Sequence, residues 1–438
     1  MWINQLTTQE RRTMSACFMG WTLDALDVQI YSFVIPTLLA LWKISPSEAG
    51  MLGTVTLLTS ALGGWLAGLL SDRYGRVRIL QVAILWYSIF TFLCGFAQTF
   101  EQLFVFRALE GLGFGGEWAT GAVLIGEVIR NEYRGRAVGF VQTGWAVGWG
   151  LAALLFGIAF TVMPPESAWR WLFWIGLAPA LLVLWVRRHI DESAVFIRNR
   201  TNRTESLGQQ LVAIFHPDYL WTTIKVSALA TGAIGGSYTF LIWLPTYLKT
   251  VRGLSVIGTT SYTVVMIVGA FFGLLLGAHL ADRIGRKGTF LVSAIGSAVM
   301  LGIYMLIPIS DSAMLVLGLP LGFCAFMMFA PMGPYMTELY PTRMRGTGQG
   351  FCYNFGRGIG ALFPGLVGFL SKSLGLGEAI ALFGISAYGL MIIAIAFLPE
   401  TAGRALVDDG PVTDGDSPDA MPGVYEPLAA GAGVRPIA

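Results

Sequence analysis

Long apolar runs recur along the whole chain, and short polar segments that hold most of the charged residues separate them. A helix needs about 20 apolar residues to cross the hydrocarbon core of a membrane. About twelve runs reach that length, near 14–39, 49–70, 79–98, 102–128, 137–161, 170–189, 221–247, 256–280, 288–309, 313–337, 346–370 and 377–398. We therefore predict an all-α membrane protein with about twelve transmembrane helices.

The longest internal connection is polar and basic, and it divides the apolar runs six and six. After Pro399 the chain is rich in Gly, Ala, Pro and Asp and shows no periodicity, which is typical of disorder. We expect a cytoplasmic N-terminus (1–13), a six-helix bundle (14–189), a cytoplasmic linker (190–220), a second six-helix bundle (221–398) and a disordered cytoplasmic tail (399–438).

Two polar motifs occur once in each half. The segment 71–78 (SDRYGRVR) matches 281–288 (ADRIGRKG) at a shift of 210 residues, and 127–139 matches 338–350 at a shift of 211. Parallel repeats of this kind pack around a central site near the bilayer midplane and rock about it. We expect the repeated acids and arginines to form a gate on the cytoplasmic side: Asp72, Arg76, Glu127, Arg134, Asp282, Arg286, Glu338 and Arg345.

Composition and charge agree with a membrane protein. The chain is 55% hydrophobic and 12% charged, whereas soluble domains average roughly 25% charged residues. A net charge of +2 without a basic stripe gives no indication of nucleic-acid binding, and the four cysteines all lie in apolar runs, so a disulfide framework is not indicated. Most Lys and Arg residues of the connections fall on one side, which places both termini in the cytoplasm of a cell with this protein in its plasma (inner) membrane.

Several charges inside the apolar runs have no counterpart in the other half. Residues that the repeated fold requires should occur in both halves, whereas these charged residues occur in one half only. An ionisable group within a membrane helix is costly unless it is paired or hydrated, so each is a functional candidate. The carboxyls among them could take up a proton outside and release it inside, with Asp27 our first choice of carrier. The proton-coupling candidates are Asp24, Asp27, Arg107, Glu110 and Glu117.

A fixed cation near the middle of the eleventh run, Arg357, suits bidentate binding of a carboxylate. Helical spacing places further polar side chains on the same faces as these charges, and aromatic residues could supply flat apolar walls. Together they predict a site for a small organic anion with an apolar or ring-shaped body. The substrate-binding candidates are Tyr31, Gln142, Trp145, Trp149, Tyr238, Trp243, Tyr353, Asn354 and Arg357.

The repeated D-R-x-G-R loops, the R-A-L-E-G-L-G-F-G segment that starts at Arg107, and the terminal P-E-T-A-G-R resemble the major facilitator superfamily. The segments L-D-A-L-D (23–27) and G-L-G-F-G-G-E-W (111–118) are similar to its metabolite–proton symporters, which implies a carrier for aromatic acids, sialate or monocarboxylates. Glu110 stands where the superfamily motif usually has Gln, so an Arg107–Glu110 ion pair is an alternative to the usual role of that segment.

The leading hypothesis is proton-coupled uptake of a small organic acid by alternating access, with a small-molecule anion, protons and lipid as the partners. A carrier of sugars or other neutral solutes, a drug–proton antiporter and a transporter-like sensor are the alternatives. Gly111, Gly113 and Gly116 satisfy G-x-G-x-x-G, but within a membrane helix this pattern indicates close packing rather than dinucleotide binding. No metal-ligand spacing or nucleophile–His arrangement occurs. We expect no enzyme activity, no cofactor besides the proton gradient, and a functional monomer.

Overall fold

The computed structural model describes residues 2–192, 212–340 and 345–402. Within these ranges the side chains of a few helical residues are not described, among them four predicted gate residues: Asp72, Arg134, Asp282 and Arg345. Most of the predicted linker and tail also lies outside the described residues. What the sequence predicts for these side chains and segments therefore stays a prediction.

Helices account for almost all of the described chain. The first half contains a short 3-10 turn, η1 (Trp2–Gln5), and then α1 (Thr8–Leu41), α2 (Pro46–Tyr74), α3 (Arg76–Cys94), α4 (Phe100–Val128), α5 (Asn131–Val162), α6 (Pro165–Ile175) and α7 (Pro179–His189). The second half contains α10 (Pro217–Thr250), α11 (Val256–Arg283), α12 (Gly285–Leu306), α13 (Asp311–Met327), α14 (Phe329–Glu338), α15 (Arg345–Gly360), α16 (Leu362–Leu374) and α17 (Leu376–Ala396).

Local sequence signals explain where several helices begin. Thr7 with Glu10, and Ser45 with Glu48, form capping boxes that satisfy the first backbone N–H groups of α1 and α2. The glycine of each D-R-x-G-R loop has a positive φ, 107° at Gly75 and 83° at Gly285, a conformation that L residues with side chains rarely adopt. The repeated glycine therefore marks the same tight turn in both halves.

Ten helices of the described chain are long and apolar enough to cross a membrane, counting α6 with α7 and α13 with α14 as single crossings. The two predicted crossings that fall outside this set are α4, which carries Arg107, Glu110 and Glu117, and the pair α15–α16, which contains Arg357. Both of these predicted crossings carry charged residues that have no counterpart in the other half of the chain. The all-α fold with about twelve crossings in two halves is confirmed.

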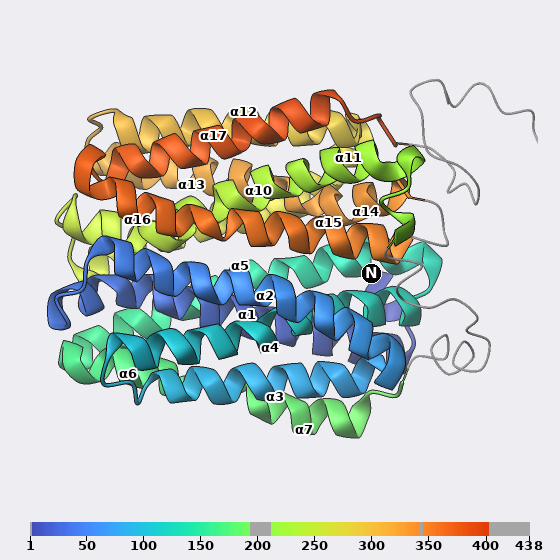
Figure 1. The fold of residues 1–438 in the computed structure, drawn as a ribbon, viewed down its shortest axis with the longest axis horizontal. Helices are drawn as coiled ribbons and strands as arrows, with labels where there is room; N and C mark the ends of the chain where they lie inside the picture. The colour runs from blue at the N-terminus through green and yellow to red at the C-terminus, as the bar shows by residue number, and fades with distance from the viewer. Residues whose placement is uncertain (1, 193–211, 341–344, 403–438) are drawn as a thin grey trace, which may run out of the picture.

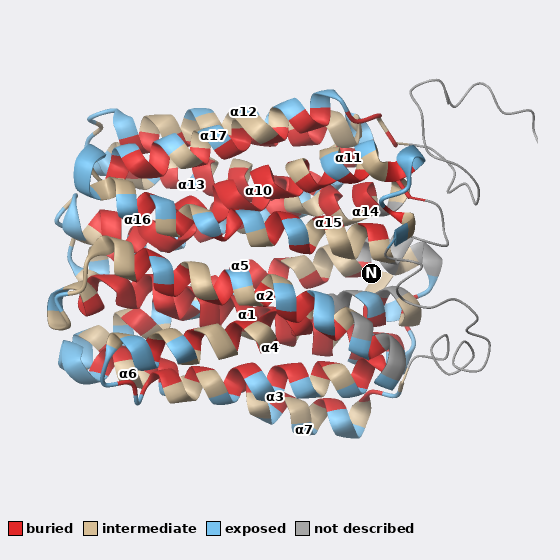
Figure 2. Cartoon of the chain, viewed as in Figure 1, coloured by how far each residue is buried: buried red, intermediate tan, exposed pale blue. Residues whose placement is uncertain are grey.

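The two halves lie side by side with their helices along the long axis of the molecule (Figure 1). Helices α1 and α10 form the centre, because 83% and 94% of their apolar windows are buried, against at most 50% for the other eight crossings. Figure 2 shows the same difference, with buried residues along the inner helices and exposed residues on the outer ones. Lipid would cover the outer apolar faces.

The halves pack tightly at one end of the bundle. We call the end where α1 begins and where Gly75 and Gly285 turn the chain the basic end, and the opposite end the far end. At the far end the N–H of Gly365 on α16 donates to Thr54 Oγ1 on α2 at 3.0 Å. A Cβ on Gly50 would lie only 2.7 Å from the carbonyl oxygen of Pro364. Small residues thus let the two halves close against each other at this end.

Candidate functional site

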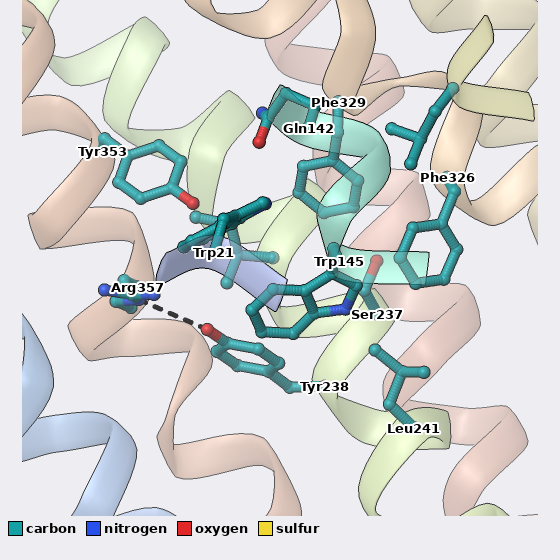
Figure 3. A pocket seen from close by; sticks show the side chains of 12 residues that line it. Trp21, Gln142, Trp145, Ser237, Tyr238, Leu241, Phe326, Phe329, Tyr353 and Arg357 are labelled. Carbon is teal, nitrogen blue, oxygen red and sulfur yellow. Dashed lines mark hydrogen bonds between the residues drawn. The ribbon is translucent and has the colours of Figure 1, made fainter. Parts of the chain in front are cut away.

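A cavity lies between the two halves at the middle of the bundle (Figure 3). Its walls come from α1 and α5 in the first half and from α10, α11, α13, α14 and α15 in the second. Most of the wall is aromatic or aliphatic, and the polar groups are few. The lining residues are Trp21, Gln142, Trp145, Ile234, Ser237, Tyr238, Leu241, Leu274, Phe326, Phe329, Tyr353 and Arg357.

Arg357 is the cationic side chain in this lining. Its Nε–H donates to the hydroxyl of Tyr238 at 3.2 Å, and its guanidinium carbon lies 4.7 Å from the centre of the Phe114 ring. The side chain is 1% exposed, yet Nη1 has no hydrogen-bond partner among the described residues, which also offer Arg357 no ion pair within 4 Å. A buried N–H donor without an acceptor is costly, so the geometry leaves a place for an acceptor, such as a carboxylate oxygen, at Nη1.

Asp24 and Glu117 form a pair of carboxyl groups close to Arg357. Each is within hydrogen-bonding reach of the other, and Arg357 exerts an electrostatic effect on both. Both carboxylate oxygens of Asp24 and Oε2 of Glu117 lack a donor among the described residues. Two carboxyl groups can bond to each other only when one of them carries a proton. A role of this pair in proton coupling stays a prediction.

A second charged group lies toward the far end. Arg107 Nη1 donates to both carboxylate oxygens of Glu110, at 2.7 and 3.0 Å, and its guanidinium carbon lies 4.5 Å from the centre of the Tyr31 ring. The structure thus contains the ion pair that the sequence left as an alternative. Asp27 lies within reach of Glu110, and neither of its oxygens has a donor among the described residues. Asp24 is one helical turn from Asp27, so α1 connects the two charged groups.

Aromatic side chains close the cavity on the side of the first half. The ring of Trp21 lies 4.2 Å from that of Trp118 and 4.8 Å from that of Trp145, and Trp118 lies 6.2 Å from Tyr353 across the interface between the halves. The indole N–H of Trp21 is buried without an acceptor among the described residues. Buried tryptophans usually satisfy this donor, so Trp21 is a candidate to donate to a bound molecule.

Five of the nine substrate-binding candidates line the cavity: Gln142, Trp145, Tyr238, Tyr353 and Arg357. The other four are buried outside its lining. Tyr31 donates its hydroxyl proton to Ala49 O, Trp243 Nε1 donates to Pro364 O at 3.0 Å, and Asn354 Nδ2 donates to Gly350 O at 2.9 Å. Trp149 stacks on Phe326, with the ring centres 5.8 Å apart. A substrate-binding role for these four stays a prediction.

Sequence reasoning missed Trp21, although its spacing of three residues from Asp24 places both on one face of α1. It also missed Ser237, one residue before Tyr238, and the paired aromatics Phe326 and Phe329. These aromatic residues gave no signal, because a phenylalanine in a membrane helix is most often a packing or lipid-facing residue.

Each half has an Arg–Glu ion pair at the basic end, and we call each of these pairs a clamp. Arg76 Nη2 lies 3.0 Å from Glu127 Oε1, and Arg286 Nη2 lies 3.2 Å from Glu338 Oε1. These four are the predicted gate residues with described side chains, and each pair stays within its own half. Their part in gating stays a prediction.

A glutamate that was not among the predicted gate residues completes each clamp. Glu192 accepts from the backbone N–H of Arg76 at 2.9 Å, and Glu400 accepts from that of Arg286 at the same distance. Each carboxylate thereby caps the N-terminus of the third helix of its half, where the helix dipole favours negative charge.

The described residues contain no group of three His, Cys, Asp or Glu side chains that could hold a metal ion. The fold and the site together form a bundle of about twelve membrane crossings that encloses a central, charged, aromatic-lined cavity between two repeated halves. That combination defines a multi-pass membrane transporter rather than an enzyme.

Comparison with known proteins identifies the family to which the chain belongs. The model of the Major Facilitator Superfamily matches residues 17–365 and 272–410, so the chain belongs to this family. A probable 4-methylmuconolactone transporter of Cupriavidus pinatubonensis is 43% identical over 436 residues, covering 99% of each chain. The cis,cis-muconate transport protein of Acinetobacter baylyi is 31% identical and covers 87% of this chain and 93% of its own length.

Among solved structures, a D-xylose–proton symporter aligns with a TM-score of 0.72 and 20% identity, covering 90% of this chain and 99% of that one. At this level of identity the likeness supports the fold alone.

Proposed function

We propose that this protein imports a small organic acid anion, aromatic or short aliphatic, by proton-coupled symport with alternating access. The observation that carries the proposal is Arg357, a buried guanidinium with an unpartnered Nη1 in the wall of a largely apolar cavity. A carboxylate would accept a hydrogen bond from this Nη1, and the aromatic walls would hold a flat or apolar body. The two relatives described above, named for muconolactone and muconate transport, support an organic acid as the substrate.

The count of buried charges supports coupling to protons. Arg107 and Arg357 face four buried carboxyl groups: Asp24, Asp27, Glu110 and Glu117. With every group ionised the site would hold two uncompensated negative charges in a low-dielectric interior, which is strongly unfavourable. An anion at Arg357 would add a further negative charge, so substrate binding favours uptake of a proton by Asp24 or Glu117.

The proton gradient supplies enough free energy to drive accumulation of the substrate. One proton moving inward gains about 2.3 kcal/mol per 100 mV of membrane potential and about 1.4 kcal/mol per pH unit. A monoanion that travels with one proton is electroneutral and uses the pH term only, while a second proton adds the voltage term. No cofactor besides the proton gradient enters this scheme.

We place the basic end in the cytoplasm, with both termini there and the protein in the inner membrane, since positively charged loops favour that side. The far end is then the outer face, where the halves close through Gly50, Thr54 and Gly365. A rocking motion of the two halves would open this face in exchange for the cytoplasmic one. The cavity is complete within one chain, which supports a functional monomer.

A carrier of neutral solutes is the second candidate. A sugar needs no cation in its site, so the buried Arg357 argues against it. The test is uptake of labelled benzoate, cis,cis-muconate and nicotinate into proteoliposomes, with and without an imposed pH gradient, in parallel with uptake of labelled xylose and of a cationic dye. Accumulation of an acid only with the gradient supports symport. Movement of the sugar or dye, with none of the acids, would contradict the proposal.

A further inference from the structure

Tyr87 belongs to α3, an outer helix, yet its side chain reaches the carboxyl groups near the centre of the bundle. In α3, 44% of the apolar window is buried, against 83% in α1. The Tyr87 side chain is 0% exposed, and its hydroxyl lies within hydrogen-bonding reach of Asp24. An outer helix therefore contributes directly to the surroundings of a proton-coupling candidate.

Glycines of α4 explain how α3 comes so close. A Cβ on Gly113 would lie 2.7 Å from the backbone nitrogen of Tyr87 and 2.9 Å from the backbone oxygen of Ala83. A Cβ on Gly116 would lie 3.3 Å from the Cβ of Ala83. Side chains rarely make contacts this short, so the two glycines let the backbones of α3 and α4 approach each other. This approach carries the Tyr87 ring inward.

The inner face of α3 meets carboxyl groups at two levels. Cys94 follows Tyr87 by about two helical turns and therefore lies on the same face. Its Sγ–H donates to Glu110 Oε2 at 3.5 Å, beside the ion pair of Arg107. Tyr87 lies at the level of Asp24. The face thus offers a thiol to one charged group and a phenol to the other.

The hydroxyl of Tyr87 and the carboxylate of Asp24 each lack a closed hydrogen bond among the described residues. A buried polar group without a partner is costly, because it has given up its hydrogen bonds to water. The shift of 210 residues pairs Tyr87 with Ser297, in the half that has no counterpart of Asp24. The phenol therefore occurs in the half that also contains the acid.

We propose that Tyr87 is a positioning residue for proton coupling, whose hydroxyl donates to Asp24 when Asp24 is ionised and so sets the pH at which the Asp24–Glu117 pair releases its proton. The inference rests on the proposed function, in which Asp24 or Glu117 takes up a proton with the substrate. The released proton passes to water, and Tyr87 keeps its own. An O–H that donates to a carboxylate favours the ionised form over the carboxylic acid.

The charged groups that face this pair come from α1 and α15. Asp27 disfavours a further negative charge on Asp24, whereas Arg357 favours the ionised form of both Asp24 and Glu117. Tyr87 adds an uncharged donor. Its effect can therefore be removed without changing the number of charges in the site.

Tyr87→Phe removes the hydroxyl and keeps the ring, so the variant should fold. Tyr304→Phe is the matched control. Tyr304 lies on α12, the helix of the second half that corresponds to α3, and is 1% exposed with a hydroxyl that has no partner among the described residues. The groups that act on it electrostatically are Tyr262, Tyr247 and Arg252, none of which is a carboxyl.

The first measurement needs no substrate. Infrared spectroscopy follows the carboxylic C=O band of the Asp24–Glu117 pair as the pH is raised, and Asp24→Asn and Glu117→Gln assign the band. Tyr87→Phe should move this titration upward by at least about one pH unit, the effect of losing one hydrogen bond to a charged group. Tyr304→Phe should leave it in place. An unmoved titration in Tyr87→Phe, or an equal shift in Tyr304→Phe, would overturn the role of Tyr87.

The second measurement is equilibrium binding of labelled benzoate between about pH 5.5 and about pH 9, a range in which benzoate itself stays ionised. A proton on the pair favours the bound anion, so affinity should fall as the pair loses its proton. Tyr87→Phe should move this fall upward by the same amount as the infrared titration, and affinity at the lowest pH should be unchanged. A loss of affinity at every pH would indicate a structural role and contradict the proposal.

The double variant separates a direct effect on Asp24 from an indirect one. In Asp24→Asn, the addition of Tyr87→Phe should cause no further shift of the pH profile, because the acceptor carboxylate is already absent. A further shift of the same size would contradict the proposed contact. If the unmodified protein binds none of benzoate, cis,cis-muconate and nicotinate, the proposed function fails, and the infrared titration still decides on Tyr87.

Discussion

The carboxyl group of Glu117 occupies the space that a side chain at position 20 would need. A Cβ on Gly20 would lie 2.1 Å from Glu117 Oε1, so the glycine lets α1 and α4 approach with the acid between them. The atom in conflict is the end of a flexible side chain, and it can rotate away. Gly20 thereby holds Glu117 beside Asp24 rather than holding the fold together.

We predict that Gly20→Ala folds and keeps its thermal stability, because alanine also raises helix propensity by up to about 1 kcal/mol. Displacement of the Glu117 carboxyl from Asp24 should lower pH-driven uptake about tenfold, equivalent to about 1.4 kcal/mol. Initial uptake rates across a pH series, with the melting temperature in detergent, check both parts. Gly389→Ala on α17, where a Cβ meets nothing within 4 Å, should change neither quantity; an unaltered pH profile in Gly20→Ala would contradict the positioning role.

Arg357→Ala should abolish carboxylate binding. Loss of one partner of a buried charge pair costs about 2–5 kcal/mol, or at least about 30-fold in affinity. Arg357→Lys keeps the charge but loses the planar fork, so it should bind with intermediate affinity. Equilibrium binding of labelled benzoate to the purified protein measures the series, and Tyr238→Phe, which removes only the acceptor of Arg357 Nε, should have the smallest effect.

Asp27→Asn should retain substrate binding and exchange but lose pH-driven accumulation, because the amide cannot carry a proton. Asp24→Asn and Glu117→Gln provide the comparison, since these two carboxyls lie nearer to Arg357. Exchange and accumulation are measured on the same vesicles. Accumulation that survives in Asp27→Asn would move the carrier role to Asp24 or Glu117.

The architecture could be predicted from the sequence because apolar length and internal repeats are strong signals. The unrepeated charges also directed attention to the residues that the structure gathers around Arg357. Periodicity gives the face of a helix, however, and not what that face packs against. Trp149 shares a face of α5 with Gln142 and Trp145, yet it stacks on Phe326 outside the lining, and Trp243 donates to the backbone carbonyl of Pro364.

The two clamps show a second limit of prediction from the sequence. Glu192 and Glu400 have equivalent positions in the two halves, but their spacing of 208 residues differs from the shifts of 210 and 211 that relate the other motifs. Small length differences in the loops hide such a match. Only the structure shows that both carboxylates accept from backbone N–H groups at the starts of α3 and α12.

Glu400 predicts a pH-dependent stability. Burial opposes its ionisation, but the backbone N–H groups of Ala402, Arg286, Lys287 and Thr401 outweigh that effect and lower the pKa of Glu400 below the usual value of about 4.3. A carboxyl with a lowered pKa stabilises the folded state above its unfolded pKa, and this contribution disappears as pH falls through the folded pKa.

Glu400→Gln should therefore lower the melting temperature at pH 7, by a change equivalent to about 0.3–1 kcal/mol for a charge at a helix N-terminus. The difference from the unmodified protein should shrink below about pH 4. Melting curves in detergent at pH 7 and at successively lower pH measure it. A difference that persists at low pH would contradict the electrostatic explanation.

The cavity also predicts a preference for one carboxylate over two. Arg357 is the cationic group among the described residues that line it, and the opposite walls are formed by Trp145, Phe326 and Phe329. A second carboxylate would meet these apolar walls without a counter-ion, at a cost of several kcal/mol unless it takes up a proton. Gln142 and Ser237 are the neutral polar groups that a hydroxyl or carbonyl could reach.

Monocarboxylates with a neutral polar group should therefore compete for labelled benzoate at least about tenfold better than dicarboxylates of similar size at pH 7. Lowering the pH to about 5 should narrow the difference, because the second carboxyl then becomes partly neutral. Gln142→Lys should improve binding of the dicarboxylate while weakening none of the contacts of Arg357. Equal competition by both classes in the unmodified protein would show that a second cation reaches the cavity in the transporting state.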